Sequence, residues 1–194
     1  MTLIAGKNAS ATGRVLVAHN EDDGGFVVVR HGWVPPQDWA AGSVMPAEEG
    51  CAEIPQVSHT LGYYWTEYRK DTCGLTTADG SVNECGVVIV SNSMGTSRES
   101  MENADCVKNG GIGYNLRRAL AERAGSAREG ARILMELIDE WGYAPSGRAY
   151  TIADKDEAFM FQLVRGRHYM GARVPDDALA VMPNHYNLHS LHDC

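Results

Sequence analysis

The chain has 194 residues, 44% of them hydrophobic and 22% charged, and its formal net charge is −8. This length and composition are typical of one globular domain with a core of its own, so a single domain is predicted over residues 1–194. The negative charge argues against nucleic acid or an anionic membrane surface as the main partner, and no stretch of roughly 18 apolar residues predicts a membrane span.

The first ten residues and the cysteines indicate the compartment. The segment MTLIAGKNAS reaches Lys7 too early to form the apolar core of a signal peptide. The five cysteines are odd in number, scattered and without a CxxC pair: Cys51, Cys73, Cys85, Cys106 and Cys194. Free thiols in a reducing compartment are expected, and we predict a cytoplasmic protein.

The N-terminal part is predicted to consist mostly of strands. Strand patterns cover residues 14–20 (RVLVAHN), 26–33 (FVVVRHGW), 59–68 (HTLGYYWTEY) and 85–93 (CGVVIVSNS). The last of these is an apolar run between turn residues, typical of a buried central strand, and Cys85 at its start is expected in the core. Residues 34–58 are rich in Pro, Ala, Gly and Glu and predict a long surface excursion.

Two helices and four short strands are predicted next. The helix patterns are residues 114–124 and 126–142; the second begins with a capping box, Ser126 and Glu129, and stops at Gly142. Strand patterns follow at residues 148–154, 158–164, 167–174 and 178–184. Strands, a helix pair and strands again predict an α+β fold of stacked antiparallel sheets with helices on an outer face.

Three polar segments are candidates for a site. The stretch AHNEDDGG, residues 18–25, contains His19 and Asp22 and is locally a good turn sequence. Asn83 comes just before the predicted central strand, and Asn184 follows the last apolar strand. Such positions can hold an amide rigidly and aim it into a cleft. A plain turn and the wall of an active site both fit these residues locally.

The C-terminal tail offers a metal alternative. His185 and His189 are four residues apart, and His192, Asp193 and Cys194 follow, so a small zinc hydrolase is conceivable. The segment HYNLHSL is a poor helix, however, and a solvated loop without metal is the favoured interpretation. Four other cysteines could be nucleophiles, but none has a recognisable setting with a nearby histidine: Cys51, Cys73, Cys85 and Cys106.

Four separated segments together resemble one family. They are GKNASATGRVLVAHNEDDG, VNECGVVIVSNS, SAREGARILMELIDEWGY and the stretch from GRAYTIAD to MPNHY. In this order they resemble the N-terminal half of the C69 dipeptidases, which include secernin-like proteins and belong to the N-terminal nucleophile hydrolases. RVPDDALAVMPN after ADKDEAFMFQ is the most diagnostic part. The resemblance implies a four-layer αββα sandwich, incomplete here because family members continue for a comparable length.

The resemblance also implies a reaction. Family members hydrolyse dipeptides or similar small amides with an N-terminal cysteine, whose own α-amino group serves as the base. A small peptide is therefore the expected substrate, and no metal or organic cofactor is expected. A homo-oligomer is possible, and the residues that bind the substrate are not indicated.

Part of the family's site can be assigned by the resemblance. Asp22 matches the acid that orients the nucleophile, and His19 stands where the family has an arginine. An imidazole is shorter and mostly neutral at pH 7, so it does not replace that cation. Asn83 matches an oxyanion donor before the central strand, and Asn184 matches the amide expected after the last strand.

The nucleophile is the main departure from the family. Aligning Gly6-Lys7 with the family's Gly-Lys puts its cysteine one position before Met1, yet no cysteine precedes Cys51. Removal of Met1 would expose Thr2, but Thr2 lies two strand residues, about 6.6 Å, nearer to Gly6. We therefore expect a dipeptidase-type scaffold with little or no activity as given. The alternative is a non-catalytic binding or assembly module, because an incomplete sandwich exposes apolar sheet surface.

Overall fold

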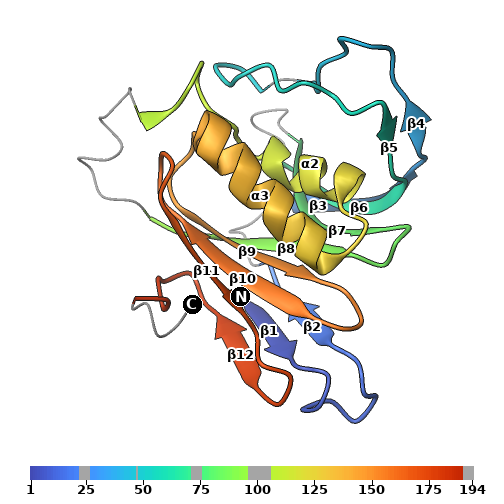
Figure 1. Cartoon of the computed structure of the whole chain (residues 1–194), viewed down its shortest axis with the longest axis vertical. Helices are drawn as coiled ribbons and strands as arrows, with labels where there is room; N and C mark the ends of the chain where they lie inside the picture. The colour runs from blue at the N-terminus through green and yellow to red at the C-terminus, as the bar shows by residue number, and fades with distance from the viewer. Residues whose placement is uncertain (22–26, 47, 71–75, 96–105, 190–194) are drawn as a thin grey trace.

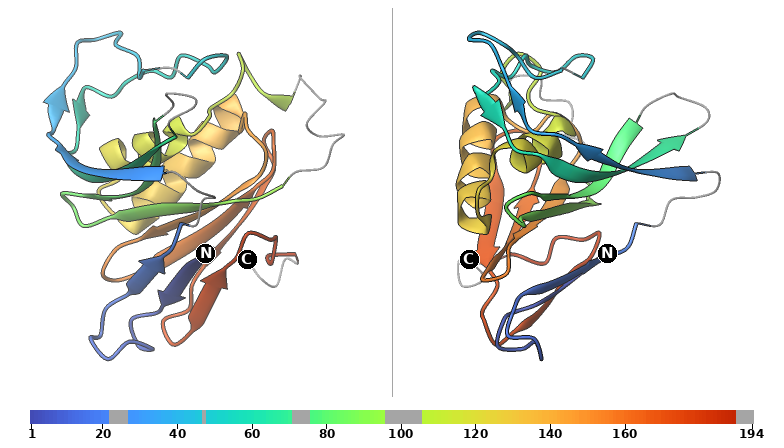
Figure 2. Two further views of the ribbon diagram at one scale, coloured as in Figure 1. Left: turned by 180° about the vertical axis from the view of Figure 1, so that it is seen from behind. Right: turned by 90° about the vertical axis from the view of Figure 1, so that its right-hand side faces the viewer.

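The computed structural model describes residues 1–21, 27–46, 48–70, 76–95 and 106–189 (Figure 1). In this part of the chain, helices α2 and α3, a seven-stranded sheet and a three-stranded sheet follow one another as layers, as the two views of Figure 2 also show. The predicted α+β sandwich is thus confirmed. Helices cover one outer face in the described ranges, which hold three of the four expected layers.

The larger sheet has the strand order β11-β10-β9-β8-β7-β6-β3, and all neighbours are antiparallel. In chain order its strands are β3 (Val27–Val34), β6 (Tyr63–Lys70), β7 (Thr76–Asn83), β8 (Val88–Ser93), β9 (Arg148–Ala153), β10 (Ala158–Leu163) and β11 (Tyr169–Arg173). Only β7 lies outside the strands predicted from the pattern. Its sequence, TTADGSVN, carries Asp and Gly in its middle and lacks an apolar alternation.

The smaller sheet has the order β12-β1-β2, from β12 (Leu179–Met182), β1 (Thr2–Ala5) and β2 (Leu16–His19). A glycine is needed just after β1, because a Cβ at Gly6 would lie 2.3 Å from the Pro175 carbonyl oxygen. Lys7 then pairs with Asp176 at 3.1 Å. These contacts explain the Gly-Lys step after the first strand. A third, two-stranded sheet joins β4 (Gln37–Asp38) and β5 (His59–Thr60).

The helices are α2 (Asn115–Arg123) and α3 (Ala127–Trp141). The predicted capping box is confirmed: the Ser126 hydroxyl accepts the Glu129 N–H at 3.2 Å, and the Glu129 carboxylate accepts the Gly125 N–H at 3.0 Å. Gly142 ends α3 with a positive φ of 74°. Neither helix, nor any other in the described ranges, has the length and apolar character needed to cross a membrane.

Strand β9 is buried on both faces and divides the core in two. Tyr150 and Ile152 face the helices, and Ala149 and Ala153 face the smaller sheet, where Ile4 packs with them. The larger sheet is therefore the central layer of the described structure. A side chain on β9 therefore lies either under the helices or against the smaller sheet.

Two expectations about the fold are wrong. Cys85 is exposed, because it lies in the turn between β7 and β8 and not in the core. Residues 34–58 are more than a surface excursion, since Met45, Ala52 and Ile54 are buried against the helix-side core. The excursion returns to cover the start of α2.

Candidate active site

The two sheets are joined by one buried hydroxyl group. Thr2 is 0% exposed, and its Oγ1 lies 2.8 Å from His19 Nδ1 and 2.7 Å from Asn92 Oδ1. His19 belongs to the smaller sheet and Asn92 to the larger one. The hydroxyl therefore links an imidazole and a carboxamide that come from different layers.

The sequence brings these groups together through strand register. Thr2 lies opposite His19 in the β1–β2 pair, so both side chains point to the same face of the smaller sheet. That face is turned toward the larger sheet, where Asn92 ends the apolar run of β8. Alternation along β8 directs Asn92 toward β1 and Ser91 toward the helices.

The histidine has a second polar contact. Its Nε2 lies 3.5 Å from the Glu21 carboxylate, and the His19 side chain is 9% exposed. The backbone nearby is also fixed, because the Met1 amino group donates to the Asn20 carbonyl at 2.8 Å. Asp22, the acid assigned by the family resemblance, lies outside the described residues.

Asn184 lies at the same end of β8. Its Nδ2 donates to the Ser93 carbonyl at 2.8 Å, one residue beyond Asn92. The segment after β12 is held in place by Gln162, whose Oε1 accepts the N–H groups of Asn187 and Leu188 at 3.0 and 2.9 Å. The structure thus brings Asn184 and His19 to one region.

Asn83 lies at the opposite end of β8. Its Nδ2 donates to the carbonyls of Ala121 and Ala124 at 3.2 and 2.7 Å. Its Oδ1 accepts the N–H groups of Cys85 and Val87 at 3.1 and 3.0 Å. This amide is fully used by the backbone at the end of α2 and the start of β8. Five strand residues, about 17 Å, separate Val87 from Asn92, so the structure does not bring Asn83 to Thr2.

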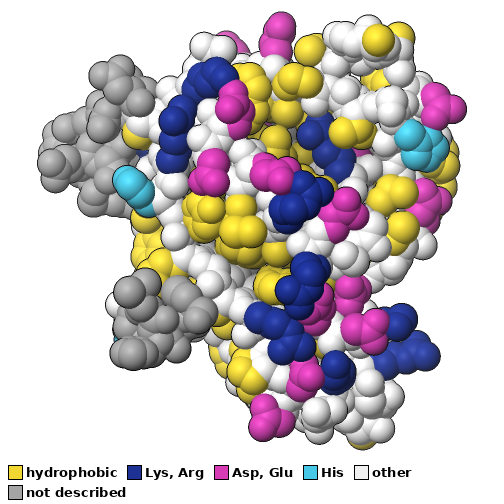
Figure 3. All heavy atoms as spheres, in the orientation of Figure 1, with side chains coloured by type: hydrophobic (Ala, Val, Ile, Leu, Met, Phe, Trp, Pro, Cys, Tyr) yellow, Lys and Arg dark blue, Asp and Glu magenta, His cyan; other side chains and the backbone are white. Residues whose placement is uncertain are grey.

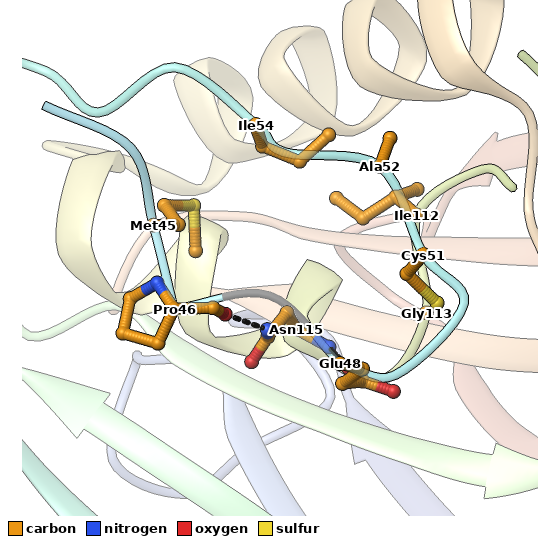
Figure 4. A pocket seen from close by; sticks show the side chains of 9 residues that line it. All are labelled: Met45, Pro46, Glu48, Cys51, Ala52, Ile54, Ile112, Gly113 and Asn115. Carbon is orange, nitrogen blue, oxygen red and sulfur yellow. Dashed lines mark hydrogen bonds between the residues drawn. The ribbon is translucent and has the colours of Figure 1, made fainter. Parts of the chain in front are cut away.

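The cavity beside Cys51 is too small for a substrate. It lies at the start of α2 and encloses about 10 Å³, room for roughly one water (Figure 4). Burial, and then the Glu48 carboxylate, raise the pKa of the Cys51 thiol. The neutral thiol is favoured there, which disfavours a nucleophilic role.

A larger hollow follows the outer surface of α3. It measures about 420 Å³, and charged side chains of both signs border its apolar strip of Ile133, Leu137 and Trp141 (Figure 3). Its lining offers no nucleophile: Val57, Arg123, Glu129, Arg132, Ile133, Glu136, Leu137, Glu140 and Trp141. This groove therefore lacks the groups for amide hydrolysis.

The zinc alternative finds no support in the described part of the chain. His185 and His189 are exposed, and the described residues contain no group of three or more His, Cys, Asp or Glu side chains that could hold a metal. His192, Asp193 and Cys194 lie outside the described residues.

The fold is similar to that of a solved structure. The structure of penicillin V acylase from Agrobacterium tumefaciens matches 89% of this chain and 49% of that protein, with a TM-score of 0.53 and 12% sequence identity. At this identity the match concerns the fold alone.

The chain belongs to peptidase family C69, whose model matches residues 1–193. A probable dipeptidase of Latilactobacillus sakei is 24% identical over 191 residues, which cover 98% of this chain and 40% of the relative. Probable dipeptidase B of Lactococcus lactis is 28% identical over 197 residues, covering 96% of this chain and 39% of the relative. The chain thus spans less than half the length of these relatives.

Asn92 and Glu21 are the site residues that sequence reasoning did not single out. Asn92 carries a signal of its own, since VIVSNS places an amide directly after a buried apolar run. Glu21 belongs to the acidic turn, but only the position of His19 shows which acid reaches the imidazole.

Proposed function

We propose that the protein is a dipeptidase-type hydrolase of small peptides whose active site lies around Thr2, His19, Asn92 and Asn184, and that the chain as given has little or no activity because the nucleophilic cysteine is missing. Membership of family C69 and the dipeptidase names of its relatives support this function. The geometry supports the position, because polar groups from β1, β2, β8 and the segment after β12 meet at one end of the sandwich.

One observation carries the proposal, the register of the smaller sheet. Thr2 lies opposite His19 on one side and Met182 on the other. Continued by two residues, this register puts the position before Met1 between Glu21 and Asn184. That is where the family's nucleophilic cysteine aligns, and its side chain would point to the same face as Thr2.

The roles follow from these positions. A cysteine at that position attacks the peptide carbonyl, its α-amino group takes the thiol proton, and the leaving amine receives that proton as the C–N bond breaks. Water then hydrolyses the resulting thioester, which releases the acid and restores the thiol. The carboxamides of Asn92 and Asn184 are the candidate donors to the developing oxyanion, in place of Asn83, whose amide hydrogens are already bound. Asp22 remains the proposed acid that orients the nucleophile. Because these groups supply base and donors, the proposal requires no metal or organic cofactor.

The proposed role of the Thr2 hydroxyl is to position the strand that would carry the nucleophile. Its contacts with His19 and Asn92 fix the first inward-facing position of β1 relative to β8. The proposed role of His19 is to position Thr2 through this contact, and that role does not require the positive charge of the family's arginine.

The test is hydrolysis of a dipeptide panel by two proteins. One is the chain as given, and the other has Met1 replaced by Cys-Thr, so that a cysteine occupies the aligned position. We expect at most trace hydrolysis by the first and clear hydrolysis by the second. Two results would contradict the proposal: an inert but folded Cys-Thr variant, or hydrolysis by the given chain that survives Thr2→Ala.

A second candidate function, assembly or binding without catalysis, is favoured by one surface. The outer face of the smaller sheet exposes Leu3 by 47%, Leu16 by 49%, Leu179 by 77% and Val181 by 45%. Apolar side chains gathered on one sheet face mark a contact surface. Light scattering separates the candidates: a homo-oligomer that Leu179→Lys dissociates supports assembly, and a stable monomer contradicts it.

We also infer a cytoplasmic location. Cys51 and Cys85 are free thiols in the described structure, as expected in a reducing compartment. Secretion of the natural protein with Cys51 oxidised would contradict this inference.

A further inference from the structure

A second polar cluster lies on the helix side of the larger sheet. Arg148 opens β9 and is only 6% exposed, and Arg117 of α2 is 1% exposed. Their guanidinium carbons lie 5.1 and 5.3 Å from the centroid of one ring, that of Tyr114. Burying a guanidinium group is costly unless an opposite charge and hydrogen bonds compensate for the lost water.

Arg148 is poorly compensated. Its Nε donates to the Ser91 hydroxyl at 3.2 Å, which uses one of the five N–H donors of a guanidinium group. In the part of the chain that the structure describes, Arg148 forms no ion pair. The Tyr114 ring offers a cation–π contact, but a ring face accepts none of the remaining N–H groups as an anion would.

Two buried hydroxyl groups lie in the same space. Tyr143 and Tyr150 are both 0% exposed, and their rings meet edge to face with centroids 6.4 Å apart. The two hydroxyl groups interact with each other, but neither makes a well-formed hydrogen bond with a described residue. Buried hydroxyl groups without well-formed hydrogen bonds are rare, because their lost hydration is not replaced.

Both tyrosines are donors at neutral pH. Burial raises the pKa of Tyr143 and that of Tyr150, so both hydroxyl groups keep their protons. The charges of Arg117 and Arg148 both act to lower these pKa values. Arg148 lies two residues from Tyr150 on β9, so the two side chains share one face of the strand. Glu48 also acts on Tyr150, but its carboxylate accepts the Asn115 N–H at the start of α2.

We propose that Arg148, Tyr143 and Tyr150 bind a small monovalent anion between α2 and the larger sheet, either chloride or the carboxylate of a small acid. The three side chains present donors and one positive charge, and these are the complement of an anion. A bound water would satisfy the hydroxyl groups but leave the charge of Arg148 without a partner.

The proposed site lies directly behind the candidate active site. Ser91 receives the Arg148 hydrogen bond on the helix side, and its neighbour Asn92 contacts Thr2 on the other side. A bound anion would therefore fix the end of β8 through Arg148, on the face of the sheet opposite Thr2. The proposal does not depend on the hydrolytic function, because it concerns the opposite face of the sheet.

The first test is thermal unfolding at constant ionic strength, with sodium gluconate replaced stepwise by sodium chloride or sodium acetate. Gluconate, a much larger anion than chloride or acetate, serves as the reference. We expect Tm to rise by about 5 °C between 1 and 300 mM of the binding anion, for a Kd of a few mM. The anion that gives the rise identifies the ligand as chloride or a carboxylate.

Isosteric variants make the test specific. Tyr143→Phe and Tyr150→Phe each remove one hydroxyl group whose partner among the described residues is the other tyrosine hydroxyl, so both variants should be about as stable as the parent in gluconate. They should lose most of the anion-dependent rise, as should Arg148→Gln. Tyr64→Phe and Arg132→Gln, at exposed positions, should keep it.

The second test is a crystal grown in sodium bromide. An anomalous peak within hydrogen-bond distance of Arg148 and a tyrosine hydroxyl is the expected result. The proposal is overturned if the crystal shows water there and no bromide. An equal Tm rise in all salts, or a chloride-specific rise that persists in both tyrosine variants, would overturn it too.

Discussion

Two buried asparagines lie near the opposite ends of β8, and they differ in the partners of their side chains. Asn83 and Asn92 flank the same apolar run and are 3% and 2% exposed. In the described structure, the Asn83 side chain hydrogen-bonds with backbone groups at the end of α2 and in the β7–β8 turn. Asn92 instead bonds a side chain of the other sheet. A buried amide is thus identified as structural or functional by its partners, and not by its burial.

The largest effect is expected from Asn83→Ala. The substitution leaves the carbonyls of Ala121 and Ala124 and the N–H groups of Cys85 and Val87 without their partner. We expect a loss of roughly 2–4 kcal/mol in the free energy of unfolding, measured by urea denaturation. Asn83→Asp keeps an acceptor oxygen but turns a carboxylate toward the carbonyl oxygens of Ala121 and Ala124, so it should not restore the stability. A loss below that of Asn92→Ala would reverse the comparison between the two ends.

A smaller effect is expected at the other end, from Thr2→Val and Asn92→Ala. Each removes one side of the hydrogen bond between the sheets, and each should cost about 1–2 kcal/mol of unfolding free energy. Because the two groups are partners, the double variant should cost less than the sum, with a coupling energy of about 1 kcal/mol in a double-mutant cycle. Strict additivity would mean that this bond does not join the sheets.

The smallest effect is expected at Asp154, a charged counterpart of Asn83. Its carboxylate accepts the N–H groups of Ala127, Asp156 and Glu157 at 2.8, 2.8 and 3.0 Å. Burial alone would raise the pKa of Asp154, but these bonds bring it below the ordinary value of 3.8. A lowered pKa in the folded state stabilises the protein above pH 3.8, and this stabilisation is lost as pH falls through the folded pKa.

Asp154→Asn should therefore lower Tm at pH 7 by less than Asn83→Ala does. The difference from the parent protein should shrink as the pH is lowered below 4, as followed by thermal unfolding across a pH series. A difference that stays constant down to pH 2 would show that the carboxylate charge is not what the N–H groups recognise.

Much of the fold could be predicted because the pattern is local. The helices from Asn115 and Ala127 carry helix formers and a capping box, and the strands from β8 to β12 are short apolar runs between turn residues. β7 was missed because Asp79 and Gly80 interrupt its pattern. Cys85 was misplaced because the strand begins at Val88, after a turn that the asparagine before it organises.

The candidate site could be predicted only in part. His19 and Asn184 were found because strand ends and the family resemblance both mark them. Asn92 was missed because its meaning depends on Thr2, which lies ninety positions away and is brought to it by sheet stacking. Asn83 matched the motif, but the carbonyls at the end of α2 that occupy its amide are a tertiary contact. The register of β1 between β2 and β12 likewise becomes visible only in three dimensions.

The most direct test of the account is dipeptide hydrolysis in the Cys-Thr variant with substitutions at both ends of β8. Asn92→Ala should lower kcat by about 10²–10³-fold, the effect of losing one oxyanion donor. Cys85→Ser, in the exposed turn at the other end, should leave kcat unchanged. A folded Asn92→Ala variant with unchanged kcat, or a Cys85→Ser variant that loses activity, would contradict the placement of the active site at Asn92.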